Sequence, residues 1–196
     1  MKKGGTGGAN TNANGLSFES KTDLATAIQT DLSNKYKLTE MQFANKSTAK
    51  AYVVTRLSDN KDIGIITQQN RFYDVMKAHY GLDNANYKKW KPDEVFFNFE
   101  ANTVFIVEKK WQSGQGSVDE KILGFVNKHR LYQNNFNQLE NEPKPTVAFC
   151  ALFNASWWLY GNKGSNAKRY QDYFDILRLD SIKIFFDDYE YWWFGL

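Results

Sequence analysis

The sequence is poor in cysteine, histidine and proline. Its 196 residues include one cysteine, two histidines and three prolines. The single cysteine, Cys150, excludes an internal disulfide, and because it stands in an apolar run we expect it to be a buried small side chain. No CxxC or HExxH pattern occurs, so nothing in the sequence supports a zinc site.

Long hydrophobic runs are also missing. No stretch approaches the roughly 20 apolar residues of a membrane span, and the N-terminus has lysines but no apolar signal region. We therefore expect a cytoplasmic protein with no membrane partner. Its 42% hydrophobic and 16% aromatic content argue against disorder, and its length suits one domain. The formal charge of +3 permits nucleic-acid binding but does not demonstrate it.

One hairpin organises the chain. Two apolar runs, Val95–Phe99 and Val104–Val107, flank a polar turn at 100–103. Each run is too short for a helix and is rich in Val, Ile and Phe, so we predict two paired strands. A turn centred between Glu100 and Ala101 sets Val95 opposite Ile106 and, further out, Asp93 opposite Glu108.

Alternation along the second strand decides which charged side chains share a face. Glu108, Lys110 and Gln112 fall on the face of Asp93, whereas Lys109 falls on the other face. Buried charges are costly unless they bind something, and two carboxylates beside a lysine favour a hard divalent cation such as Mg²⁺. The competing interpretation is an exposed, salt-bridged strand end, in which such pairs contribute ~0–1 kcal/mol.

These residues resemble a known motif. Pro92-Asp93, followed by Glu108-x-Lys110 after an apolar strand, resembles the PD-(D/E)xK nuclease superfamily and, within it, the type II restriction endonucleases. The continuation from Trp111 into the helix signal at 117–122 is similar to the strand-to-helix passage of that core. The resemblance covers roughly residues 15–153. It implies an α/β fold in which helices flank a mixed central sheet around an αβββαβ core.

The resemblance also implies a chemistry. It points to Mg²⁺-dependent hydrolysis of double-stranded DNA at a specific short sequence, with Mn²⁺ as a substitute cofactor. Asp93, Glu108 and the main-chain carbonyl of Lys109 would hold the metal. Lys110 would orient or deprotonate the water, or stabilise the transition state, and Gln112 would contact phosphate or scaffold. Cutting both strands of a symmetric site is simplest for a two-fold dimer, so we expect a homodimer.

A further acid stands in the first predicted helix, 15–34. Its apolar stripe includes Leu24, Ile28 and Leu32, and Glu19 lies in its first turns. In the family that this chain resembles, a first-helix acid commonly faces the metal site, which would make Glu19 a catalytic residue and a metal ligand. The alternative is that Glu19 merely complements the dipole at the helix N-terminus.

The remaining elements follow from periodicity and turn signals. We predict strands at 51–55, 63–67, 146–153 and 182–186, and helices at 71–80, 117–136 and 167–179. Ser117 and Glu120 fit a capping box at the start of the second of these helices. We expect one domain at 15–196, with a catalytic core at about 15–153 and a C-terminal elaboration at 154–196.

DNA contacts are less determined. The Gly- and Asn-rich segment 1–14 is predicted to be either a flexible leader or an arm that touches DNA. A basic and aromatic segment follows residue 154, although its aromatic side chains individually suit a core or an interface. The candidate DNA-binding residues are Asn10, Asn12, Asn14, Lys88, Lys89, Lys163, Lys168 and Arg169.

Two other functions compete with a restriction endonuclease. One is a structure-specific nuclease of the same superfamily, such as a Holliday-junction resolvase or a repair enzyme. The other is a DNA-binding protein on a degenerate nuclease fold that does not cleave. The second is disfavoured because Asp93, Glu108 and Lys110 are all present.

Overall fold

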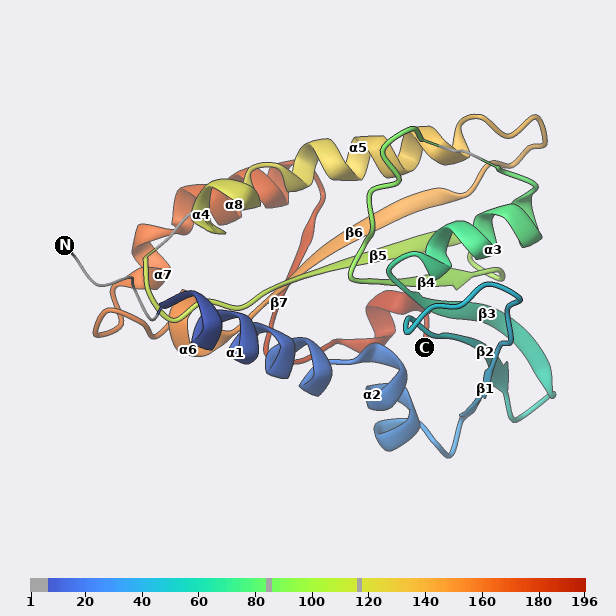
Figure 1. Ribbon diagram of the computed structural model, residues 1–196, viewed down its shortest axis with the longest axis horizontal. Helices are drawn as coiled ribbons and strands as arrows, with labels where there is room; N and C mark the ends of the chain where they lie inside the picture. The colour runs from blue at the N-terminus through green and yellow to red at the C-terminus, as the bar shows by residue number, and fades with distance from the viewer. Residues whose placement is uncertain (1–6, 84–85, 116–117) are drawn as a thin grey trace.

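The computed structural model describes the backbone of residues 7–83, 86–115 and 118–196. The chain forms a seven-stranded sheet with helices on both faces (Figure 1). The strands are β1 Tyr36–Glu40, β2 Ala51–Arg56, β3 Lys61–Gln68, β4 Glu94–Asn98, β5 Thr103–Lys110, β6 Thr146–Phe153 and β7 Lys183–Phe186. The helices are α1 Gly7–Lys21, α2 Leu24–Asp31, α3 Arg71–Tyr80, α4 Val118–Ile122, α5 Phe125–Phe136, α6 Ala155–Trp158, α7 Asn166–Arg169, α8 Gln171–Leu179 and the 3₁₀ helix η1 Tyr191–Phe194.

The sheet is mixed, and its strands lie in chain order from β1 to β7. Neighbours from β1 to β5 are antiparallel, whereas β5, β6 and β7 are parallel. Parallel neighbours need a crossover connection, and α4 and α5 supply it between β5 and β6. The predicted class, an α/β fold with a mixed sheet flanked by helices, is therefore confirmed.

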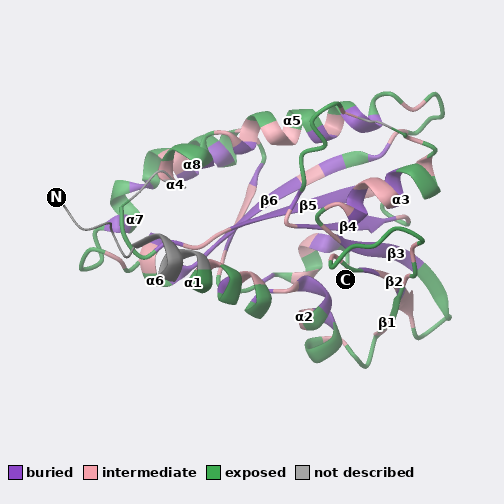
Figure 2. Ribbon diagram, in the orientation of Figure 1, coloured by how far each residue is buried: buried purple, intermediate pink, exposed green. Residues whose placement is uncertain are grey.

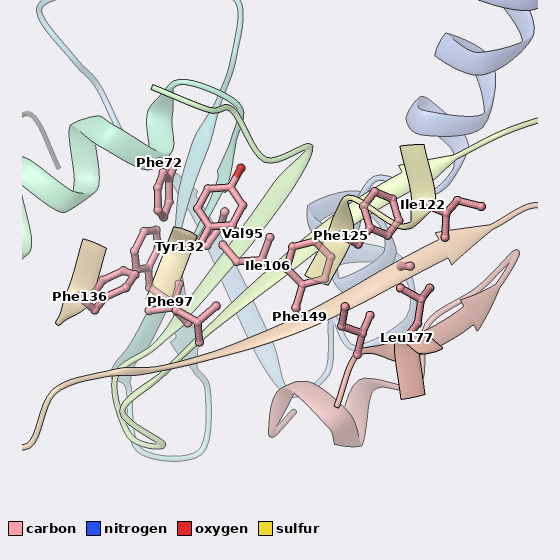
Figure 3. Close-up of a cluster of buried hydrophobic side chains, with 14 of the residues drawn as sticks. Phe72, Val95, Phe97, Ile106, Ile122, Phe125, Tyr132, Phe136, Phe149 and Leu177 are labelled. Atoms are coloured by element: carbon pink, nitrogen blue, oxygen red, sulfur yellow. The ribbon is translucent and has the colours of Figure 1, made fainter. Parts of the chain in front are cut away.

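Two apolar cores lie on the two faces of the sheet. On one face, α3, α4, α5 and α8 cover the strands, and Figure 3 shows Phe125 and Tyr132 of α5 beside Ile106 and Phe149. On the other face, α1, α2 and the C-terminal segment pack against the sheet. Figure 2 shows the central strands as mostly buried, which is the pattern expected when both faces are covered.

The hairpin register agrees with the prediction. Val95 pairs with Ile106, and the ladder begins at Glu94, which pairs with Val107. Asp93 stands just before β4, where its Oδ2 accepts a 2.7 Å hydrogen bond from the backbone N–H of Lys109. The register therefore brings Asp93 to the end of β5.

The first predicted helix, 15–34, is wrong in both its start and its continuity. The chain is helical from Gly7, so residues 7–14 of the expected arm lie in α1, and residues 1–6 lie outside the described residues. Asp23 has an extended conformation and its side chain accepts a hydrogen bond from Thr26 N at 2.7 Å. This N-cap ends one helix and begins the next.

The segment 117–136 is likewise divided. A turn at Leu123 and Gly124 separates α4 from α5, and the capping-box residue Ser117 lies outside the described residues. The C-terminal segment is joined to the rest by a shared core, because β7 pairs with β6 and Trp158 is fully buried. No helix in the described part of the chain is long and apolar enough to cross a membrane.

Candidate functional site

Three of the predicted residues meet where β4 begins and β5 ends. The Nζ of Lys110 lies 3.4 Å from Asp93 Oδ2 and 3.4 Å from Glu108 Oε2. The same ammonium donates a 2.7 Å hydrogen bond to the main-chain carbonyl of Lys109. Because Ile106 belongs to the core under α5, Glu108 and Lys110 share the α5 face of the sheet, as alternation predicted.

Glu108 is a buried carboxylate with unequal oxygens. Its Oε2 lies 2.7 Å from Nζ of Lys128 on α5, in addition to the contact with Lys110. Its Oε1 has no hydrogen-bond partner among the described residues. Burial raises the pKa of Glu108, and the negative charge of Asp93 raises it further, whereas Lys110 and Lys128 lower it. The free oxygen is therefore the place where a ligand could attach.

Lys128 was not predicted, although a signal was present. It lies three residues after Phe125 and four before Tyr132, two members of the predicted apolar stripe. Residues at these spacings share a helix face, so the period alone places Lys128 toward the sheet. What the period does not give is the register of α5 along β5, which aligns Lys128 with Glu108.

The site holds Lys110 in its charged form. Burial alone would lower the pKa of Lys110, but the charges of Asp93 and Glu108 outweigh it and raise the pKa overall. The ammonium also lies 5.5 Å from the centroid of the Phe125 ring. A charged donor held among three oxygens is suited to bind a phosphate oxygen or to orient a water molecule.

Lys109 lies on the opposite face of the sheet, as predicted. Its Nζ lies 2.9 Å from Glu94 Oε2 and donates to the carbonyls of Thr22 and Glu19 at 2.7 and 3.1 Å. The Glu94 carboxylate in turn accepts from the backbone N–H of Leu24, at the start of α2. Burial raises the pKa of Glu94 to about 8, against the opposing effect of Lys109. This cluster fastens α1 and α2 to the sheet behind the site.

Glu19 lies in the last turn of α1, not in its first turns. A negative charge there opposes the helix dipole, so the dipole alternative for Glu19 is wrong. Burial, and then the charge of Asp93, raise the pKa of Glu19, which places this carboxyl near the site. Within the described residues, however, no three Asp, Glu, His or Cys side chains gather closely enough to hold a metal ion. The role of Glu19 as a ligand stays a prediction.

The donor set nevertheless fits a hard cation. Asp93 and Glu108 offer carboxylate oxygens, and the carbonyl of Lys109 lies beside them, held by Lys110. Such oxygens are the ligands that Mg²⁺ prefers. A buried carboxylate oxygen without a partner calls for an explanation, and a cation at Glu108 Oε1 would be one.

Gln112 forms hydrogen bonds with neighbouring elements of the fold through both its backbone and its side chain. Its backbone N–H donates to Asn154 Oδ1 at 2.8 Å, and Asn154 Nδ2 donates back to its carbonyl at 2.9 Å. The side-chain Nε2 donates to Asp119 Oδ1 at 2.8 Å. These bonds join the ends of β5 and β6 to α4, so of the two predicted roles the scaffold is the one that the contacts favour.

Two hollows adjoin the site. A groove of about 930 Å³ lies between α1, Trp90, the end of β5 and helices α4 and α5, and Lys110, Lys121 and Lys128 line it. A pocket of about 470 Å³ on the α2 side is lined by Asp23, Glu94 and other polar residues. Glu19 borders both hollows. The larger one combines apolar walls with positive charge, a combination that suits bases and phosphates.

The candidate DNA-binding residues are dispersed. Asn10 and Asn12 lie in the first part of α1, for which the structure describes the backbone alone. Asn14 is exposed in the same helix. The ammonium of Lys88 lies 4.4 Å from the centroid of the Trp90 ring, and Trp90 borders the groove. Lys89 is exposed beside it. Lys88 is therefore next to the groove through its contact with Trp90, and Lys89 lies between the two in sequence.

The basic segment after residue 154 is exposed but is not part of the groove lining that the structure describes. Lys163, Lys168 and Arg169 are exposed in and before α7. Tyr170 follows them and donates to Asp119 Oδ2 at 2.9 Å, which ties the segment to the start of α4. Contact of these three residues with DNA stays a prediction.

No protein-family model, curated protein sequence or solved structure matches this chain. Function therefore has to be argued from the site itself. That site offers two carboxylates, a carbonyl oxygen and two ammonium groups beside a groove of about 930 Å³.

Proposed function

We propose that this protein is a Mg²⁺-dependent endodeoxyribonuclease that cleaves double-stranded DNA at a specific short sequence, as type II restriction endonucleases do. The observation that carries the proposal is the meeting of Asp93, Glu108 and Lys110 on one face, while Lys109 is sequestered on the other. A chance match to the short motif would not require Asp93 to meet Glu108 and Lys110.

The fold is compatible with the αβββαβ core of that superfamily. In that assignment α1 is the first helix, β3, β4 and β5 are the three strands, and α5 and β6 complete the core. The strand β4 alone runs opposite to β3, β5 and β6. The catalytic hairpin, β4 and β5, lies at the centre of the sheet, where both faces are covered.

Each residue has a task in phosphodiester hydrolysis. Asp93, Glu108 and the carbonyl of Lys109 would hold Mg²⁺, which lowers the pKa of water and neutralises charge on the phosphate. Lys110 carries a raised pKa and stays an ammonium, so it is better suited to bind a phosphate oxygen than to remove a proton. The N–H of Lys109 fixes the orientation of the Asp93 carboxylate.

The substrate suggests the wider setting. Lys110, Lys121 and Lys128 give the groove a positive lining for a DNA backbone. Cleavage of both strands of a symmetric site would be carried out by a homodimer. We place the enzyme in the cytoplasm, where it would meet double-stranded DNA.

The test is digestion of a sequenced plasmid by the purified protein with Mg²⁺, followed by run-off sequencing of the ends. Discrete cuts at one short sequence are expected, and Asp93→Ala protein purified in the same way should give none. Cleavage confined to branched DNA would replace the proposal with a structure-specific nuclease. Binding of duplex and branched DNA without any cleavage would replace it with a DNA-binding protein.

A further inference from the structure

Lys128 is a second lysine at Glu108, and it comes from outside the hairpin. Its Nζ lies 2.7 Å from Glu108 Oε2, closer than the 3.4 Å of Lys110. The Glu108 side chain is 1% exposed, whereas that of Lys128 is 24% exposed. Lys128 therefore stands at the boundary between the buried carboxylate and the groove that it lines.

This ion pair balances a charge that would otherwise be costly. A buried carboxylate that loses its partner destabilises the fold strongly, and Glu108 has both Lys110 and Lys128 on one oxygen. Its other oxygen has no partner among the described residues. A divalent cation bound there would meet the ammonium of Lys128 at short range, and like charges repel most strongly where water is excluded.

We propose that Lys128 is a built-in counter-ion of Glu108, which a divalent cation displaces and which then binds a phosphate group of the nucleic acid in the groove. The phosphate step rests on the proposed function, whereas the displacement step does not. A lysine has a long flexible stem and three rotatable donors, so the ammonium can leave Oε2 and stay in the groove. While it is paired with Glu108, the ammonium lies 5.7 Å from the centroid of the Phe125 ring.

The displacement step is tested without DNA. Free Mn²⁺ is followed by electron paramagnetic resonance during titration of the full chain, as wild type and as Lys128→Gln. The variant is expected to bind Mn²⁺ at least fivefold more tightly, because the competing positive charge is gone. Lys121→Gln is the matched control: it removes a charge from the same groove but none from Glu108, so its affinity should stay within twofold of wild type.

A second measurement uses the unaltered protein, in case Lys128→Gln does not fold. The rate at which an acylating reagent modifies each lysine is followed by mass spectrometry. Saturating Mn²⁺ should raise the rate at Lys128 several-fold and leave the rate at Lys121 unchanged. An unchanged rate at Lys128 would overturn the displacement.

The phosphate step is tested by fluorescence anisotropy of a labelled DNA duplex with Ca²⁺ in place of Mg²⁺. Lys128→Gln should weaken binding about tenfold, and Lys128→Arg should largely restore it. Undiminished binding by Lys128→Gln would overturn this step.

The outcomes separate this proposal from the function on which it rests. Equal Mn²⁺ affinities in wild type and Lys128→Gln would overturn the role of Lys128 and leave the nuclease intact. Tighter Mn²⁺ binding by the variant, with no cleavage by wild type, would support the displacement and overturn the nuclease. A wild-type protein that binds no Mn²⁺ would overturn both.

Discussion

Lys109 and Lys110 are adjacent in sequence, yet their ammonium groups lie on opposite faces of the sheet. Lys110 Nζ is 3.4 Å from Asp93 Oδ2, whereas Lys109 Nζ is 2.9 Å from Glu94 Oε2. The first ammonium borders a groove, and the second is enclosed between the sheet and the helices α1 and α2. One strand thus separates a lysine that borders the groove from a lysine that is enclosed behind the sheet.

Replacing the two lysines by methionine should separate activity from stability. Lys110→Met is expected to lower the cleavage rate by about 10²–10³-fold, as the loss of one charge-stabilising donor typically does. Lys109→Met removes the donor that serves Glu94 and the carbonyls of Thr22 and Glu19, and should lower the free energy of unfolding by roughly 1–3 kcal/mol for each buried acceptor left unpaired. Cleavage assays and urea denaturation of both variants provide the comparison. A stable, fully active Lys110→Met protein would contradict the site assignment.

The ionisation of Glu94 should make the free energy of unfolding depend on pH. Burial raises its pKa to about 8 in the folded protein, whereas the ordinary value is 4.5. Because the pKa is raised, the folded state keeps this proton at pH values at which the unfolded chain has lost it. The stabilisation is therefore complete below pH 4.5 and is lost as the pH rises toward 8. The slope is at most about 1.4 kcal/mol per pH unit.

Urea denaturation between pH 5 and pH 8 checks this sign. The free energy of unfolding of wild type should fall, relative to that of Glu94→Gln, as the pH rises. A difference that does not change with pH would mean that Glu94 is ionised, as a partner of Lys109, throughout this range.

The hairpin was predictable because its determinants are local. A tight turn fixes the register, and a period of two residues then assigns Glu108 and Lys110 to one face and Lys109 to the other. The structure agrees with this assignment and with the helix at 71–80. The burial of Cys150 also agrees with the prediction.

The failures lie where a single residue outweighs the periodic pattern. Asp23 caps a new helix in the middle of an apparently continuous stripe, and Gly124 lies in the turn that interrupts another. Lys128 reaches Glu108 only because α5 packs on β5 and β6 in a particular register. No pattern in the sequence contains that register, because it depends on how the side chains of the two elements interlock.

The position of Glu19 in the last turn of α1 allows a test of its role. In the last turn of a helix a carboxylate is unfavourable for the dipole, so Glu19→Gln should leave the free energy of unfolding unchanged or raise it by a few tenths of a kcal/mol. If Glu19 serves the metal, the same variant should bind Mn²⁺ more weakly, by about tenfold or more. Unchanged Mn²⁺ affinity and cleavage rate would remove Glu19 from the site.

Tyr132 places a hydroxyl group in the buried core. The side chain is buried between α5 and the sheet, and its hydroxyl has no hydrogen-bond partner among the described residues. Burial, followed by the charges of Glu108, Tyr73 and Asp93, raises the pKa of Tyr132, so the hydroxyl stays neutral. Removing an unpaired buried hydroxyl is nearly neutral or stabilising, whereas removing a bonded one destabilises by about 1–3 kcal/mol.

Tyr132→Phe is therefore expected to unfold with the free energy of wild type or up to about 1 kcal/mol above it. Tyr132→Ala is the matched control and should lose about 3–5 kcal/mol, because the aromatic ring fills the core beside Phe72 and Phe149. Urea denaturation of both variants at neutral pH measures the difference. A loss of more than 1 kcal/mol in Tyr132→Phe would show that the hydroxyl bonds a group at the site, and Glu108 would then be the first partner to examine.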